Sequence, residues 1–126
     1  MQGNPVGWFE IYVDDMERAK TFYQQVFAVS LEQITDPTNE GVIMHSFPSD
    51  MDKYGAGGAL VKIPDVCAGN NSVIVYFSCN DCALEESRVN QAGGQVQRPK
   101  MSIGEYGFIS IFKDTEGNTI GLHSLQ

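Results

Sequence analysis

The chain has 126 residues, of which 42% are hydrophobic and 19% are charged, and these values are typical of one globular domain. Eight basic against sixteen acidic side chains give a net charge of −8, so nucleic acid and anionic membrane surfaces are not expected partners. No apolar run approaches the roughly 20 residues that span a bilayer. Residues 1–5 also lack the basic and apolar stretches of a secretion signal, and we expect a cytoplasmic protein.

The first predicted element is a strand over Val6–Val13. Successive side chains of a strand point to opposite faces, and apolar residues fall on every second position here. One face carries Phe9, Ile11 and Val13, and the other carries Trp8, Glu10 and Tyr12. We expect the first face to be buried under a helix and the second to face away from that core.

A helix is predicted to follow this strand. Asp14, with Glu17 three residues later, resembles a capping box and marks the start of the helix. Apolar residues then recur at helical spacing: Ala19, Phe22, Tyr23, Val26 and Phe27. Short strands are expected at about 30–35, 42–47 and 57–63, with the turn-rich segment Pro48–Gly58 between the last two.

The second half repeats this order. Ser72–Cys79 is a predicted strand, and Asn80 or Asp81 can cap a helix that runs to about Ala92. Strands at about 95–98, 107–113 and 119–125 follow, with Asp114–Asn118 as a hairpin turn. The predicted fold is α+β, a single domain over 1–126 with βαβββ modules at about 5–63 and 72–126 and a linker at about 64–71. Its expected core between sheet and helices includes Phe9, Ile11, Val13, Phe22, Val26, Val73, Val75 and Phe77.

Three stretches then resemble a known family. They are Val-Asp-Asp-Met-Glu-Arg-Ala-Lys-Thr-Phe-Tyr (13–23), Gln-Ala-Gly-Gly-Gln-Val (91–96) and Asp-Thr-Glu-Gly-Asn-Thr-Ile-Gly-Leu-His (114–123). With the repeated module order, they resemble the glyoxalase/bleomycin-resistance/extradiol-dioxygenase superfamily, also called the vicinal oxygen chelate fold. The resemblance implies a metal-dependent enzyme or a metal-free binding protein, and homodimers are common in that superfamily.

The resemblance also implies where a metal would bind, on the first and last strand of each half. Those positions correspond to Trp8, Ile74, Gly121 and a residue within 58–61. None of these side chains can ligate a divalent metal, so we expect neither a metal nor a cofactor at the family position. Glu10 and His123 keep the same face and could form half of a shifted metal site or a hydrogen-bonded pair. The face of His45 cannot be fixed from the sequence.

The residues expected to bind a ligand are Trp8, Glu10, Tyr12, Tyr76, Tyr106 and His123. Aromatic walls with a few polar groups are typical of small-molecule sites, and a carboxylate there favours cationic or hydrogen-bond-donating ligands. An alternative is that the aromatic rings pack against each other and fill the concave face. In the enzyme alternative, Glu10 is a general base and His123 its partner acid. The segments 51–58 and 101–107 could be lids, hairpin connections or dimer contacts.

The three cysteines do not predict a disulfide framework. Their number is odd, and Cys79 and Cys82 have the spacing of a redox motif but lack its other residues. We expect both to be ordinary buried thiols.

Overall fold

The computed structural model describes residues 4, 6, 8–35, 41–71 and 73–126. The first half contains β1 (Trp8–Tyr12), α1 (Met16–Phe27), β2 (Glu32–Ile34), β3 (Ile43–Ser46) and β4 (Gly57–Lys62). The second half contains β5 (Val75–Ser78), α2 (Cys82–Val89), β6 (Gln95–Ser102), the 3₁₀ helix η1 (Gly104–Tyr106), β7 (Phe108–Lys113) and β8 (Thr119–Ser124). The predicted α+β fold of two βαβββ units is confirmed. Pro5 and Ser72, on which expected bounds fall, and Gly7, within the first expected strand, lie outside the described residues.

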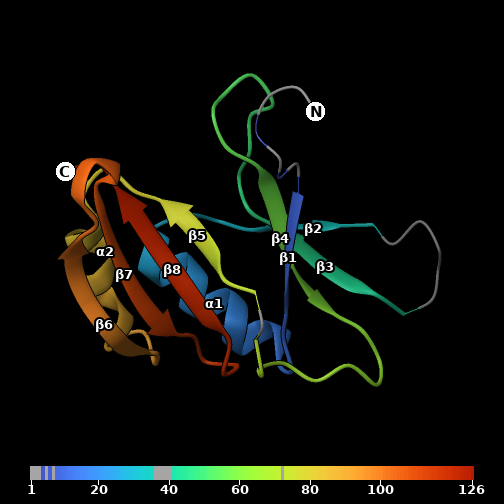
Figure 1. The fold of residues 1–126 in the computed structure, drawn as a ribbon. Helices are drawn as coiled ribbons and strands as arrows, with labels where there is room; N and C mark the ends of the chain where they lie inside the picture. Colours follow the sequence, from blue (N-terminus) through green and yellow to red (C-terminus); the bar gives the residue numbers. More distant parts are fainter. Residues whose placement is uncertain (1–3, 5, 7, 36–40, 72) are drawn as a thin grey trace.

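Each half forms its own four-stranded sheet. The strand orders are β1-β4-β3-β2 and β5-β8-β7-β6. In both sheets the first strand pairs in parallel with the last strand of its module, and the other pairs are antiparallel. Figure 1 shows the two sheets side by side with β1 and β5 at their facing edges, and the helices behind them. β1 and β5 are therefore the edge strands on the inner side of each sheet.

The helix start in the first half differs by one residue from the prediction. Asp15, not Asp14, is the N-cap of α1, because its side chain accepts the backbone N–H of Arg18 at 3.1 Å. Asp14 instead accepts the backbone N–H of Ala68 at 3.0 Å. Two adjacent aspartates offer the same local chemistry, so only a contact with a distant segment decides which one caps the helix.

The second helix is shorter than expected. Of the two predicted candidates, Asn80 and Asp81, it is Asp81 that caps α2, by accepting the backbone N–H of Ala83 at 3.0 Å. The α-helix ends at Val89, three residues before Ala92, and the backbone N–H of Gly94 bonds to the Val89 carbonyl.

Aromatic rings from both halves form one continuous core. Phe77 of β5 stacks on Phe27 of α1 with ring centroids 4.8 Å apart, and meets Phe9 of β1 edge-on at 5.2 Å. Phe22 of α1 lies 6.0 Å from Phe112 of β7. Such ring pairs contribute beyond the area that they bury. The helices complete this core: α1 packs against β4 and α2, and α2 packs against β6, β7 and β8.

Most of the expected core is confirmed. Ile11, Val13, Phe22 and Val26 are buried, while Phe9 and Phe77 are half-buried and pack against the core. The prediction was wrong for Val73, since 70% of its surface is exposed, and Val75 is half-buried and lies outside the core cluster. Val73 precedes β5, which begins only at Val75, so strand alternation does not hold its side chain under a helix.

The β7–β8 turn fastens the second half to the first. Glu116 of this turn is buried and accepts the backbone N–H groups of Asp14 and Asp15, each at 2.9 Å. Its carboxylate also accepts two bonds from the Arg18 guanidinium, at 2.7 and 2.8 Å, and one from the Thr115 hydroxyl. Burial alone would raise the pKa of Glu116, but these donors outweigh it and lower the pKa to about 2.

Two more turn residues extend this connection. Asp114 is buried and accepts a 2.6 Å bond from the hydroxyl of Tyr23 in α1. Burial, with the Asp114 carboxylate beside it, raises the pKa of Tyr23 well above its usual value. Asn118 donates to the Tyr12 carbonyl at 2.8 Å and accepts the backbone N–H of Gly69 at 2.9 Å. The turn therefore contacts β1, α1 and the segment between the modules.

Replacing Glu116 tests this connection. Glu116→Gln should lower the free energy of unfolding by about 1–3 kcal/mol at pH 7, because the Arg18 guanidinium and two backbone N–H groups lose a buried, charged acceptor. The control Glu17→Gln removes an exposed carboxylate, 4.0 Å from Lys20. This variant should change the free energy of unfolding by less than about 0.5 kcal/mol. Urea denaturation monitored by circular dichroism measures both variants.

The pH dependence follows from the lowered pKa of Glu116. The stability that its ionised form contributes is complete above the unfolded pKa of 4.5 and is lost as the pH falls toward about 2. The stability difference between the wild type and Glu116→Gln should therefore be constant above about pH 5 and shrink below pH 4.5. A difference that stays constant from pH 7 to pH 3 would contradict this role.

Candidate functional site

A large hollow lies between the edge strands β1 and β5. It has a volume of about 730 Å³, and β1 contributes Trp8, Phe9 and Glu10 to its wall. From β5 and the residues before it come Val73, Ile74, Val75, Tyr76, Phe77 and Ser78, and Tyr54, Gly55 and Ala56 come from the loop before β4. The wall is mostly apolar and aromatic, and Trp8 and Tyr76 are each 45% exposed. This composition suits an organic ligand.

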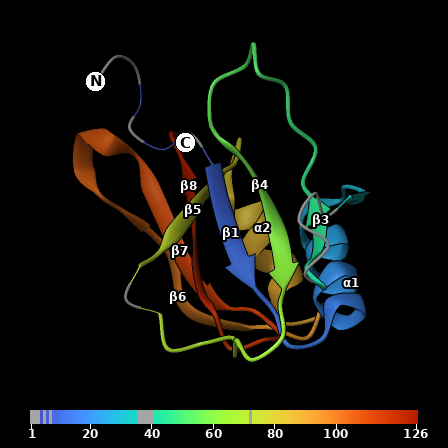
Figure 2. The same ribbon diagram turned by 90° about the vertical axis from the view of Figure 1, so that its right-hand side faces the viewer.

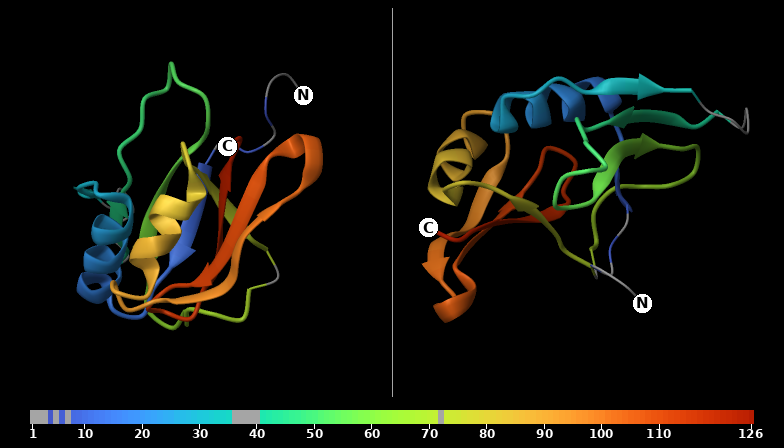
Figure 3. Two further views of the ribbon diagram at one scale, coloured as in Figure 1. Left: turned by 90° about the vertical axis from the view of Figure 1, so that its left-hand side faces the viewer. Right: turned by 90° about the horizontal axis from the view of Figure 1, so that it is seen from above.

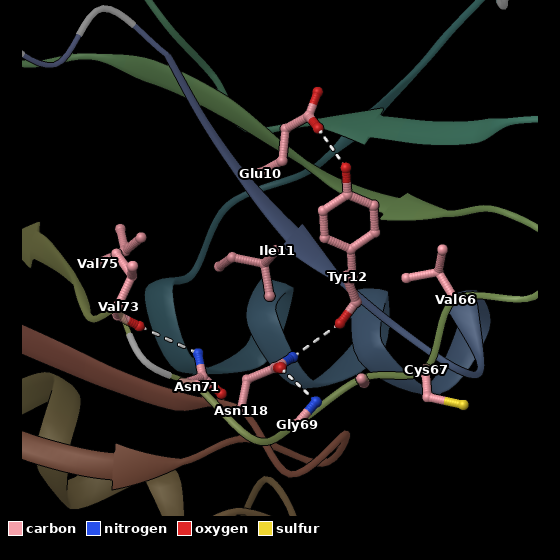
Figure 4. Close-up of a pocket in the computed structure, with 11 residues that line it drawn as sticks. Glu10, Ile11, Tyr12, Val66, Cys67, Gly69, Asn71, Val73, Val75 and Asn118 are labelled. Carbon is pink, nitrogen blue, oxygen red and sulfur yellow. Dashed lines mark hydrogen bonds between the residues drawn. The ribbon is translucent and has the colours of Figure 1, made fainter.

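A second, smaller hollow of about 230 Å³ continues along β1. It is lined by Glu10, Ile11 and Tyr12, by Val73 and Val75, and by residues of the segment between the modules, including Cys67 and Asn71. Figure 4 shows these side chains, with Asn118 bridging the Tyr12 carbonyl and Gly69. Because the two hollows share Glu10, Val73 and Val75, we treat them as one feature and call it the interstrand trench.

Glu10 is held by its two aromatic neighbours on the same face of β1. Its carboxylate accepts the Tyr12 hydroxyl at 2.9 Å and the Trp8 indole N–H at 3.3 Å. The bond to Glu10, followed by burial, raises the pKa of Tyr12, so its phenol stays protonated at neutral pH. Each carboxylate oxygen has one protein donor and can accept further bonds from a ligand.

The structure does not bring His123 to Glu10. His123 lies on β8, and its Nε2 atom is 2.7 Å from the Tyr106 carbonyl oxygen. A carbonyl only accepts, so Nε2 carries a proton in this bond. Neither His123 nor Tyr106 lines either hollow of the trench, and 68% of the Tyr106 surface is exposed. Their part in ligand binding stays a prediction.

The structure also fixes the face of His45. His45 pairs with Leu60 of β4 and is buried on the side of α1, whereas Glu10 pairs with Ala59 and faces the other way. Burial and nearby Lys20 lower the pKa of His45, so its imidazole is neutral at pH 7. His45 therefore cannot join Glu10 in a common site.

Several residues of the trench were not predicted as site residues. Tyr54 lies in the segment 51–58, a possible lid, and Asn118 lies in the predicted hairpin turn. Val73 was placed in the core, and Asn71 belonged to the predicted linker. No local sequence pattern marks these residues as part of a site. Each of them reaches the trench only because one module packs beside the other.

The family profile described as "Glyoxalase/Bleomycin resistance protein/Dioxygenase superfamily" matches residues 6–122. The chain belongs to this superfamily. Among curated relatives, the protein CFP32 of Mycobacterium tuberculosis is 27% identical over 96% of this chain, which spans 45% of that protein. A "Glyoxylase-like domain-containing protein" of Didymella fabae is 25% identical, and the match covers 90% of this chain and 88% of the relative. The chain thus spans about half the length of the first curated relatives that it matches.

Solved structures share the fold. Glyoxalase I from Zea mays superposes with a TM-score of 0.72 at 19% identity, over 95% of this chain and 46% of that one. TnmS3, an antibiotic binding protein from Streptomyces sp. CB03234, has a TM-score of 0.66 at 25% identity over 100% and 99% of the two chains. Within the described residues, no helix is long and apolar enough to cross a membrane.

The side chains at the positions where the resemblance implies a metal carry no group that ligates one. Trp8 and Ile74 offer no ligand atom, and β4 presents only apolar side chains from Gly58 to Val61. At Gly121 an added Cβ would collide with the Tyr76 ring, so an aromatic side chain covers this position. Within the described part of the chain, no group of three or more His, Cys, Asp or Glu residues could hold a metal.

From these residues we expect purified protein to retain no stoichiometric divalent metal after dialysis, and to gain no glyoxalase activity when nickel or zinc is added. Elemental analysis by mass spectrometry and a glyoxalase assay measure this. If metal is retained, Glu10→Gln and His123→Ala provide the next test. Loss of the metal in either variant would show that a metal site exists at a shifted position.

The cysteines differ in exposure and reactivity. Cys82 is buried, Cys79 is half-buried and Cys67 is exposed. Burial, reinforced by Glu85 and Cys82, raises the pKa of Cys79 to about 12. A thiol with such a pKa is almost entirely protonated at pH 8 and is a poor nucleophile, which is consistent with the predicted structural role of this pair.

Alkylation should separate these thiols. At pH 8, iodoacetamide should modify Cys67 in the native protein and reach Cys79 and Cys82 only after unfolding in urea. Peptide mapping by mass spectrometry gives the extent at each site. Rapid native modification of Cys79, or a Cys79–Cys82 disulfide in freshly purified protein, would instead indicate a redox-active pair.

Proposed function

We propose that the protein binds a small organic molecule in the interstrand trench, without a metal. The observation that carries the proposal is the larger hollow, because its wall combines aromatic and aliphatic side chains with a single carboxylate, that of Glu10. Its volume of about 730 Å³ lies within the range of roughly 300–1,000 Å³ that is usual for ligand sites.

The exposure of the trench aromatics supports the same proposal. Trp8 and Tyr76 come from different sheets, line one hollow, and leave nearly half of their surfaces open to solvent. A planar apolar ligand can stack on exposed aromatic side chains from both walls of a hollow, and these contacts stabilise the complex. A role in binding is also in keeping with the similar fold of TnmS3, an antibiotic binding protein.

Fluorescence of Trp8 tests the proposal, because Trp8 is the only tryptophan of the chain. A panel of neutral and positively charged aromatic compounds with one to three rings should include at least one that shifts the emission saturably. Tyr76→Ala should lower the affinity for that compound by about two- to tenfold, because an aromatic contact is lost.

Leu84→Ala is the control, because it removes an exposed apolar side chain of α2 that does not line the trench. It should leave the affinity unchanged. If no compound shifts the Trp8 emission, or if Tyr76→Ala and Leu84→Ala have the same effect, the proposed ligand site is wrong.

A further inference from the structure

The interstrand trench follows the edges of the two sheets rather than the face of either one. Consecutive residues of a strand point alternately to opposite faces, so a hollow over one face touches every second residue. All five residues of β1, from Trp8 to Tyr12, line one hollow or the other. All four residues of β5 line the larger hollow. Only a strand edge presents every residue in this way, and Figure 2 shows β1 with β4 on one side of it.

The backbone groups on these edges point into the trench. The N–H of Val13 bonds to the Val61 carbonyl at 2.9 Å, which places every second residue of β1 in the ladder with β4. The N–H and C=O groups of Trp8 and Glu10 therefore point to the open side. The carbonyl of Tyr12, which shares this direction, already accepts the Asn118 side chain from the other module.

The edge of β5 has the same arrangement. The N–H of Cys79 bonds to the His123 carbonyl at 2.8 Å, so the alternate residues Tyr76 and Ser78 direct their backbone groups away from β8. Among the described residues, the backbone N–H groups of Trp8, Glu10, Tyr76 and Ser78 have no hydrogen-bond partner. Figure 3 shows, from above, that no strand lies between β1 and β5.

The trench also carries an unneutralised charge. Of the described residues that line its two hollows, Glu10 alone has a charged side chain. Its partners, the Trp8 indole and the Tyr12 phenol, are neutral donors. No ion pair joins Glu10 to a Lys or Arg among the described residues, so a cationic group of a ligand can pair with it, and the net charge of −8 favours the approach of a basic ligand.

We infer that the trench binds a short, extended, basic peptide segment, which adds as a strand along the edge of β1. The peptide backbone bonds to the open N–H and C=O groups of Trp8 and Glu10. A Lys or Arg side chain reaches the Glu10 carboxylate, and its apolar neighbours pack between Trp8 and Tyr76. The inference rests on the proposed function in that it uses the same trench, and it specifies the class of ligand.

A basic peptide fits the trench better than the edge of a second copy of this chain. A second copy carries the same net charge of −8, and pairing through β1 would bring another Glu10 beside the first. Like charges on directly paired strands are destabilising. A basic segment removes that repulsion and satisfies both the backbone groups and the carboxylate.

The test uses the blocked peptide acetyl-Val-Thr-Arg-Thr-Val-amide and two altered forms of it. Citrulline in place of arginine keeps the shape and removes the charge, and N-methylation of alternate residues removes the backbone donors on one edge. Calorimetry and Trp8 emission should show saturable binding of the parent peptide, about fivefold weaker binding with citrulline, and about tenfold or greater loss on N-methylation.

Protein variants complete the cycle. Glu10→Gln should weaken binding of the parent peptide by about as much as the change of arginine to citrulline does. It should not weaken binding of the citrulline peptide further. Glu105→Gln, which removes a carboxylate outside the trench, is the control and should leave the affinity for both peptides unchanged. Amide hydrogen exchange should slow at Trp8 and Glu10 when the peptide is bound.

The outcomes separate this inference from the proposed function. If aromatic compounds shift Trp8 but the peptide does not bind, or if neither citrulline nor N-methylation matters, the peptide inference is wrong and the small-molecule proposal stands. If protein without peptide sediments as a dimer with the Trp8 and Glu10 amides already protected, a second copy occupies the edge and the inference is overturned.

Discussion

The position of the second module beside the first depends on the buried carboxylates of the β7–β8 turn. Glu116 accepts the first backbone N–H groups before α1 and the Arg18 guanidinium, while Asp114 accepts the Tyr23 hydroxyl. Burying such groups is unfavourable unless they are hydrogen-bonded, so these bonds favour the arrangement in which the turn meets β1 and α1. That arrangement sets where β5 lies relative to β1, and the trench follows from it.

The aromatic core explains why the two sheets meet without joining. Phe77 of β5 reaches Phe9 on β1 and Phe27 on α1, so the modules share apolar burial on the helix side. On the other side, the backbone edges of β1 and β5 remain open. Exposed strand edges invite pairing with other chains, and short strands and charged side chains reduce that risk. β1 has five residues and β5 has four, and Glu10 lies at the centre of β1.

Membership of the superfamily gives the fold of this chain but not the chemistry of its site. Trp8 carries an indole on β1, and Gly121 lies under the Tyr76 ring. The surface between the two modules is therefore mostly aromatic and aliphatic. The remaining charge, on Glu10, is held by neutral hydrogen-bond donors and is open to a ligand.

The sequence by itself determined the elements, the repeat and the two faces of β1, because the periods of helices and strands are local properties. It could not decide between Asp14 and Asp15 as the helix cap, or predict that Val73 is exposed, since contacts or strand ends outside each segment decide these. The site divided in the same way. Trp8, Glu10 and Tyr12 share a face by alternation, whereas the bond of His123 to Tyr106, the faces of β3 and the trench along two strand edges arise only when the modules pack. The bonds that fix this packing join residues about 100 positions apart, a distance at which local sequence pattern carries no information.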